Sequence, residues 1–111
     1  MIDNEIKVGE GSVALVDVMG SALSVVNAAR VSMGKRSESF DARDAKLIKY
    51  LWEHGHTSPF RHVHLQFHIK APIFVLRQWM KHQVGCAWNE ISGRYVELDE
   101  SFWSPRVWRE Q

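Results

Sequence analysis

The segment from Lys81 to Tyr95, KHQVGCAWNEISGRY, gathers chemically active side chains in one short stretch. It carries an amine, an imidazole, a thiol, a carboxylate, a hydroxyl and a guanidinium, which an ordinary helix or strand does not require together. Ser92, Gly93 and Arg94 can collect phosphate oxygens through a hydroxyl, an unhindered amide and charge-assisted hydrogen bonds. Glu90 could accept a proton or a ligand N–H. The segment is a candidate anion and heterocycle site, and the alternative is a solvated turn.

The six histidines and the single cysteine raise two other chemistries. Cys86 follows His82 by four residues, as an activated thiolate would, but Gly85 interrupts the helical register between them. His62 and His64 share a strand face, yet no cysteine or carboxylate accompanies them at a ligand spacing. We therefore expect no metal, with a metal-dependent hydrolase kept as an alternative class. Trp88 could pack, or contact a ligand or another subunit.

Length and composition set the class of protein. At 111 residues the chain has the size of one small domain, so we expect a single domain over residues 1–111. A formal charge of +1 gives no polycation for nucleic-acid or membrane binding. One cysteine excludes an internal disulfide and suits a reducing cytoplasm. No apolar run approaches the ~18 residues of a membrane span, and the N-terminus lacks the blocks of a signal peptide. These features predict a soluble cytoplasmic protein.

Hydrophobic periodicity predicts the elements that must position the segment. Residues 12–20 are apolar and β-branched between two glycines, which predicts a strand. Apolar residues at helical spacing predict helices over 21–31 and 41–54. In the second helix the expected buried face consists of Ala45, Ile48, Leu51 and Trp52. Residues 62–70 alternate between apolar and polar side chains, which predicts a strand with one face in the core.

A further helix is expected over residues 72–83, with Ile73, Leu76 and Met80 buried and a break at Gly85. On this helix Gln78, Lys81 and His82 would converge, because residues three and four apart share a face. Residues 93–98, GRYVEL, are expected to form a short strand. The predicted fold is α+β, a mixed or antiparallel sheet with packed helices.

The stretch RQWMKHQVGCAWNEISGRY resembles the signature of flavin-dependent thymidylate synthases of the ThyX type. In that signature Arg-His-Arg is followed by seven or eight residues and then Ser-X-Arg. Here the triplet is Lys81, His82 and Gln83, residues 84–91 form the spacer, and Ser92, Gly93 and Arg94 close it. VALVDVMGSALSVVNAARVS, LIKYLWEHGHTSPFRH and FHIKAPIFVLRQW also resemble successive family elements, so the likeness covers nearly the whole chain.

The resemblance implies a ThyX-like fold and the reductive methylation of dUMP to dTMP. FAD would be the cofactor, NADPH the reductant and methylenetetrahydrofolate the one-carbon donor. No cysteine attacks the pyrimidine in that family, which leaves Cys86 without a catalytic role. The family's sites are shared between the subunits of a homotetramer, so a homotetramer is the expected assembly.

The resemblance also assigns residues by position. The positions that would bind dUMP are Gln78, Lys81, Glu90, Ser92, Gly93 and Arg94. Those that would bind FAD are Ser32, Ser58, Lys81, His82, Gln83 and Glu90.

Two departures from the family accompany these assignments. Lys81 and Gln83 stand where the triplet usually has arginines, so one formal charge and two planar forks are lost. Family members also continue past the position of Gln111 into a mostly helical half that contributes to both pockets. An alternative function follows: a catalytically impaired, truncated paralogue acting as a nucleotide-binding or oligomerisation module.

Overall fold

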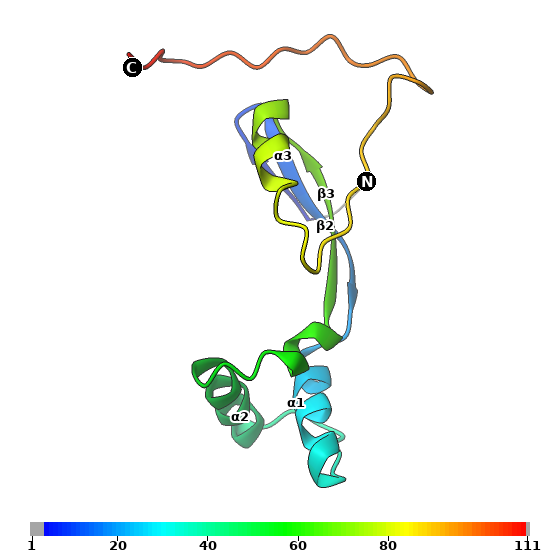
Figure 1. Ribbon diagram of the computed structural model, residues 1–111, viewed down its shortest axis with the longest axis vertical. Coiled ribbons are helices and arrows are strands. Elements are labelled where there is room, and N and C mark those ends of the chain that lie inside the picture. Colours follow the sequence, from blue (N-terminus) through cyan, green and yellow to red (C-terminus); the bar gives the residue numbers. More distant parts are fainter. Residues whose placement is uncertain (1–3, 111) are drawn as a thin grey trace. The chain divides into compact units, whose positions relative to one another are not determined.

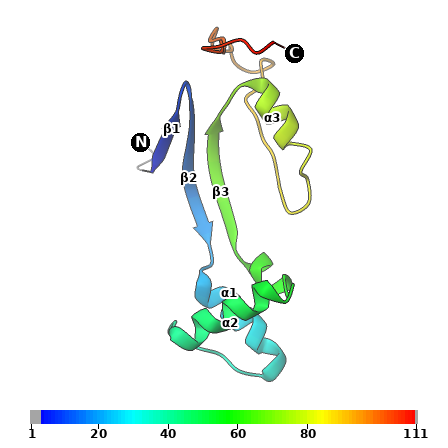
Figure 2. The same ribbon diagram turned by 90° about the vertical axis from the view of Figure 1, so that its left-hand side faces the viewer.

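The structure, a computed structural model, describes residues 4–110. Three strands form one sheet in the order β1 (Glu5–Val8), β2 (Gly11–Met19) and β3 (His64–Lys70). β2 and β3 run in opposite directions, as their arrowheads show (Figures 1 and 2). The strands predicted over residues 12–20 and 62–70 are confirmed, and so is the α+β class.

Two helices follow β2 with the predicted bounds. α1 (Ala22–Arg30) continues into the 3-10 turn η1 (Val31–Met33), and α2 (Ala42–Glu53) follows after a loop. Asp41 caps α2 by accepting hydrogen bonds from the amides of Arg43 and Asp44, and these bonds satisfy donors that the first helical turn leaves free. A second 3-10 turn, η2 (Ser58–His62), leads into β3.

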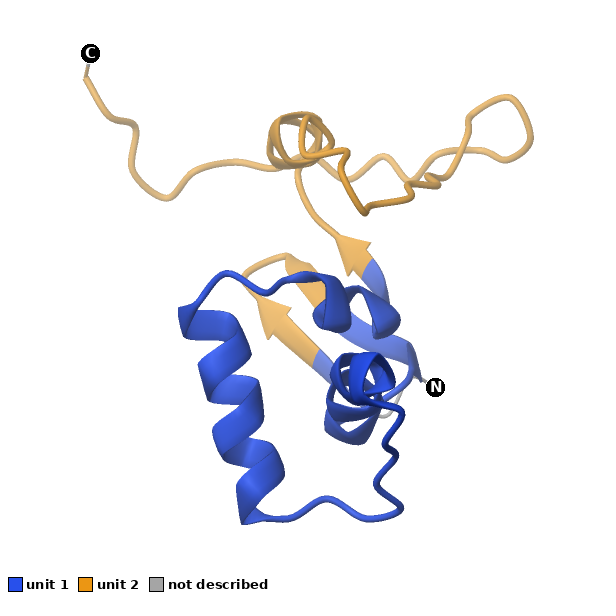
Figure 3. Ribbon diagram, turned by 60° about the horizontal axis from the view of Figure 1, so that its bottom comes forward, with its two compact units in different colours: residues 1–5, 14–68 blue, residues 6–13, 69–111 orange. Residues whose placement is uncertain are grey.

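The chain divides into two compact units (Figure 3). The first comprises Ala14–His68 and the start of the chain to Glu5, and the second comprises Ile6–Val13 and the chain from Ile69 onward. In the first unit α1 packs against α2 and η2. The buried apolar residues of this unit are Ala14 on β2, Val25 and Val26 on α1, Leu51 on α2 and Pro59 in η2.

Gly20 is required at the entry to α1. Its φ of 91° lies in the region that L-residues avoid. A Cβ on this residue would lie 3.0 Å from the carbonyl oxygen of His62 and 3.2 Å from Cγ2 of Val63. The close approach of the two segments and the positive φ therefore make any side chain here strained.

Several predicted apolar faces are not buried within the described residues. Ala45 and Trp52 on α2 are exposed, and on β3 Leu65 is 56% and Phe67 47% exposed. Alternation along a strand indicates that one face is suited to burial, but it does not indicate which chain supplies the cover. The two strand residues remain an apolar face that the described chain leaves open.

The third helix is shorter than predicted. α3 runs over Ile73–Trp79, so the predicted helix is present, but its predicted end at residue 83 and its break at Gly85 are wrong. Beyond Trp79 the amides of Lys81 and His82 bond to the carbonyls of Gln78 and Trp79 three residues earlier, which tightens the last turn into 3-10 geometry. Leu76 and Met80, predicted to be buried, are half-buried, and Ile73 is 64% exposed.

Residues 93–98 do not form the predicted strand. The carbonyl oxygen of Ser92 accepts hydrogen bonds from the amides of Tyr95 and Val96, at 3.0 and 3.3 Å, and the chain turns instead. Among residues 4–110, no helix has the length and apolar character needed to cross a bilayer.

Candidate functional site

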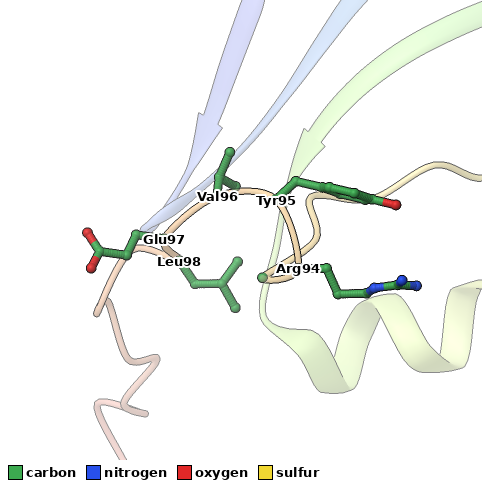
Figure 4. A pocket seen from close by; sticks show the side chains of 6 residues that line it. Arg94, Tyr95, Val96, Glu97 and Leu98 are labelled. Carbon is green, nitrogen blue, oxygen red and sulfur yellow. The ribbon is translucent and has the colours of Figure 1, made fainter.

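The Ser92–Tyr95 turn forms the centre of the first candidate site. The hydroxyl oxygen of Ser92 accepts a hydrogen bond from the amide of Arg94 at 3.3 Å, and this bond adds to those made by the Ser92 carbonyl. The turn opens onto a shallow concavity lined by residues 93–98 (Figure 4). The Ser92 hydroxyl proton remains available for a ligand, because the oxygen is used here only as an acceptor.

Arg94 is exposed and forms no ion pair with any carboxylate among residues 4–110. Its guanidinium carbon lies 5.8 Å from the centre of the Tyr95 ring, a cation–π distance. The two side chains project in the same direction, and the carboxylate of Glu97 points away from them (Figure 4). An unpaired guanidinium with a hydroxyl two residues away can bind a phosphate.

Gly93 is not needed for the conformation of this turn. Its φ is not positive, and a Cβ there would meet only the Leu98 side chain, at 3.4 Å. An alanine would therefore fit the fold with a small shift of a flexible side chain. Open backbone at this position suits the close approach of a ligand.

The other residues assigned around the signature lie on the end of α3 and on the loop after it. Gln78 is the penultimate residue of α3. Lys81 follows in a turn that is closed by a hydrogen bond from the Lys81 amide to the Gln78 carbonyl. Gln78, Lys81 and His82 were predicted to converge on one face of an α-helix. This is wrong, because the helix ends at Trp79, before Lys81 and His82. Lys81, His82, Gln83 and Glu90 are all exposed. The Glu90 carboxylate forms no ion pair within the described part of the chain.

Trp88 packs against Trp79. Their ring centres are 5.5 Å apart and the planes meet at 72°, an edge-to-face pair. The indole N–H of Trp88 is buried but has no acceptor among residues 4–110. Packing therefore accounts for the ring and leaves the N–H without a partner.

The alternative chemistries find no support in the geometry. Cys86 is exposed, and its amide bonds to the carbonyl of Gln83 in a turn, away from any helical register with His82. Within the described residues, no three histidine, cysteine or acidic side chains lie close enough to hold a metal ion.

A second cavity, of about 410 Å³, lies within the first unit. Ser32 and Ser58, assigned to the same ligand from separate parts of the sequence, both line it. The Ser32 hydroxyl donates to the carbonyl of Ala29 at 3.0 Å, which fixes its direction. The remaining lining residues come from α1, η1, α2, the loop into η2 and η2 itself: Ala28, Ala29, Met33, Leu47, Tyr50, Leu51, His56 and Pro59.

Sequence reasoning missed two polar residues of this cavity, Tyr50 and His56. The Tyr50 ring stacks on His54 at 4.0 Å between ring centres and lies 6.2 Å from the ring of His56. One signal was present, because Leu47, Tyr50 and Leu51 have helical spacing on one face of α2. The position of His56 depends on the tertiary fold.

Comparison with known proteins places these features in a family context. The model of a family described as thymidylate synthase complementing protein matches residues 14–111. The chain is 49% identical over 100 residues to a flavin-dependent thymidylate synthase of Thermotoga neapolitana, covering 90% of the chain and 45% of that protein. It is 51% identical over 102 residues to one of Thermus thermophilus, covering 92% of the chain and 37% of that protein.

Among solved structures, the chain is similar to the UMP/dUMP methylase PolB from Streptomyces cacaoi bound with 5-Br dUMP. The TM-score is 0.72 at 40% identity, covering 81% of the chain and 39% of that structure. The chain spans less than half the length of the curated relatives it matches.

Proposed function

The chain belongs to the thymidylate synthase complementing protein family, and we propose that it takes part in the FAD-dependent reductive methylation of dUMP to dTMP. Methylenetetrahydrofolate would donate the one-carbon unit and NADPH would reduce the flavin. The observation that carries the proposal is the Ser92–Tyr95 turn, which presents an unpaired Arg94 and open backbone at Gly93 inside the family signature.

In this proposal the signature turn binds the phosphate of dUMP. Arg94 supplies the charge, the Ser92 hydroxyl supplies a neutral donor, and Gly93 lets the ligand approach the backbone. Gln78, Lys81 and Glu90 would contact the nucleotide from the end of α3 and the loop after it. Glu90, which has no ion-pair partner in the described chain, can accept a ligand N–H.

The polar groups also fit a flavin dinucleotide. Ser58 offers a hydroxyl to the cavity, and Ser32, whose proton is donated to the Ala29 carbonyl, offers an acceptor oxygen. Lys81, His82, Gln83 and Glu90 would contact the cofactor from the signature. When bound, FAD supplies the hydride chemistry that amino-acid side chains lack. The protein's part is to hold the cofactor and nucleotide in register and to exclude water from the reacting atoms.

The proposal is tested by the absorbance spectrum of the purified protein with FAD and then with dUMP. We expect bound flavin whose spectrum changes when dUMP is added. Arg94→Ala should abolish the response to dUMP and leave flavin absorbance in place. Arg106→Ala, at an exposed arginine outside the site, is the matched control and should respond as the wild type does. A response to dUMP that survives Arg94→Ala would contradict the assignment of the phosphate site.

A second candidate function is a nucleotide-binding or oligomerisation module without catalysis. Lys81 and Gln83 favour it, because they leave one charge and no guanidinium fork where the family triplet usually has two arginines. It predicts dUMP binding with no flavin bound, even at excess FAD. Lys81→Arg with Gln83→Arg should then restore flavin binding, which distinguishes a weakened triplet from a missing pocket.

We also propose a homotetramer with shared sites and a cytoplasmic location. The open apolar face around Leu65 and Phe67 supports a further subunit as its cover. The exposed unpaired Cys86 suits a reducing compartment. Light scattering after size exclusion tests the assembly, and a monomer at micromolar concentration would contradict it.

A further inference from the structure

A partly buried polar network, with Asp44 as its buried member, lies beside the Ser32–Ser58 cavity. It consists of Asn27, Arg30, Ser37 and Asp44 and is called here the Arg30–Asp44 network. Asp44 is 1% exposed, and its Oδ1 lies 2.6 Å from Nη2 of Arg30. The second carboxylate oxygen, Oδ2, accepts a hydrogen bond from the amide of Asp41 at 2.9 Å. Asp44 therefore both caps α2 and joins it to the last residue of α1.

The same network holds the loop between η1 and α2. The other guanidinium nitrogen of Arg30, Nη1, donates to the hydroxyl of Ser37. Asn27 binds the Ser37 backbone twice, donating to its carbonyl at 2.9 Å and accepting from its amide at 2.7 Å. Ser37 is thus fixed at both its side chain and its backbone, which ties a surface loop to the helix pair.

Both residues of the ion pair precede, within three positions along the chain, residues that line the cavity. Ser32 and Met33 follow Arg30 by two and three residues, and Leu47 follows Asp44 by three. The amide of Lys35, after η1, also donates a hydrogen bond to the Arg30 carbonyl at 3.2 Å. A shift of Arg30 relative to Asp44 would therefore move the Ser32 hydroxyl relative to α2.

We propose that the Arg30–Asp44 network positions the Ser32 side of this cavity and so sets its affinity for the flavin dinucleotide. None of its four members lines the cavity, so they act as positioning residues. The inference rests on the proposed function for the identity of the ligand. An apolar pair of similar size could match the ion pair in stability, but it could not hold Ser37.

Hydrogen–deuterium exchange without ligand tests the geometric part independently of the proposed function. Asp44→Asn keeps an oxygen that can cap Asp41 but removes the charge opposite Arg30. Exchange at Gly34, Lys35 and Ser37 should rise about tenfold, because Arg30 loses the buried charge that holds it beside α2. The amides of α3 should exchange as in the wild type. Unchanged protection at these three amides would overturn the proposal.

Titration of the protein with FAD and, separately, with dUMP tests the consequence for the ligand. Asp44→Asn should raise the Kd for FAD about tenfold and leave the Kd for dUMP near its wild-type value. Arg30→Met combined with Asp44→Leu should recover the melting temperature but not the FAD affinity. Recovery of both by this pair would show a role in stability alone and overturn positioning.

Val26→Ala is the matched control. Val26 is fully buried on α1, does not line the cavity and makes none of the network's polar contacts, so its truncation lowers the melting temperature and leaves those contacts in place. FAD affinity should stay close to the wild type, and an equal loss in this variant would overturn the proposal. If the wild-type protein binds no FAD, the proposed function fails, and the exchange experiment alone decides whether the network holds the loop.

Discussion

At the scale of single residues, the signature turn separates what the fold needs from what a ligand needs. Arg94 is exposed and forms no ion pair within the described residues, its ring contact with Tyr95 being local to the turn. Gly93 has neither a positive φ nor a blocked Cβ direction. The fold does not require these residues, and their position together at one turn is best explained by binding of a ligand. Substitutions there should affect binding more than stability.

Gly93→Ala provides the sharpest residue-scale prediction. The added methyl meets only the flexible Leu98 side chain, so the melting temperature should stay within a few degrees of the wild type. If a phosphate approaches the backbone here, the methyl blocks it, and dUMP affinity should fall by about tenfold or more. Differential scanning fluorimetry and nucleotide titration measure the two effects. Loss of stability with unchanged binding would reverse the interpretation.

The buried indole N–H of Trp88 leads to a second prediction. A buried donor without a partner carries a desolvation penalty, so removing it should cost nothing and can stabilise the protein by about 1 kcal/mol. Trp88→Phe keeps an aromatic edge against Trp79 while removing the donor. Urea unfolding measures the change. Destabilisation well beyond that of Trp79→Phe would indicate that the N–H bonds to a partner subunit or ligand.

At the scale of elements, the sequence predicted the helices and strands in which apolar residues recur with the period of that structure. α1 and α2 have apolar residues at helical spacing, and β2 and β3 alternate or are β-branched, and all four formed. The strand at residues 93–98 failed because a β-like composition competes with the Ser92 carbonyl, which closes a turn. The predicted end of α3 was wrong for a similar reason, because hydrogen bonds between residues three apart replace the α-helical ones after Trp79.

The candidate site was predictable to the same extent. Ser92, Gly93 and Arg94 are contiguous, so the sequence alone places them together. Tyr50 and His56 join Ser32 and Ser58 only through the packing of α1, α2 and η2, which no local period encodes. The ion pair between Arg30 and Asp44 was missed for this reason too.

Gly20→Ala tests the junction between β2 and α1. The positive φ costs about 1 kcal/mol for a residue with a Cβ, and the 3.0 Å approach to the His62 carbonyl adds a steric cost. We expect a lower melting temperature for the first unit, measured by far-ultraviolet circular dichroism. Gly55→Ala, in the same unit and also at positive φ but with open space around its Cβ, is the matched control and should cost less.

The cap of α2 predicts a pH dependence. The hydrogen bonds from Arg43, followed by the amides of Asp44 and Arg43, lower the pKa of Asp41 below its ordinary value of 3.8. A lowered pKa in the folded state means that these bonds stabilise the fold above the ordinary value, and the stabilisation disappears as pH falls through the lowered pKa. Asp41→Asn still caps the helix, so it should flatten the acid limb of stability while changing little at neutral pH. Urea unfolding from acid to neutral pH measures this, and an unchanged acid limb would rule out Asp41 as its source.

At the scale of the whole molecule, burial is uneven between the two units. Among residues 4–110, the buried apolar residues all lie in the first unit, whereas the second exposes large side chains that include Tyr95, Phe102 and Trp108. Apolar surface of this kind is normally covered by other protein. A homotetramer would provide that cover.

Hydrogen exchange of the free and ligand-bound protein tests this interpretation. In the free monomer, amides of residues 84–110 should exchange close to the unprotected rate, because few backbone bonds are formed there. Protection should appear with increasing protein concentration if subunits cover the segment, or with dUMP if the ligand orders it. Strong protection at all concentrations without ligand would show that the second unit is stable by itself.

The tryptophans are divided between the units in a way that makes them optical reporters. Trp52, whose ring meets Phe60 edge-on, is the only indole in the first unit, and the other four belong to the second. Replacing Trp52 by phenylalanine therefore leaves tryptophan fluorescence that comes from the second unit alone. The difference between the wild-type and variant emission during denaturation would follow the first unit, so one instrument can record the melting of each unit separately.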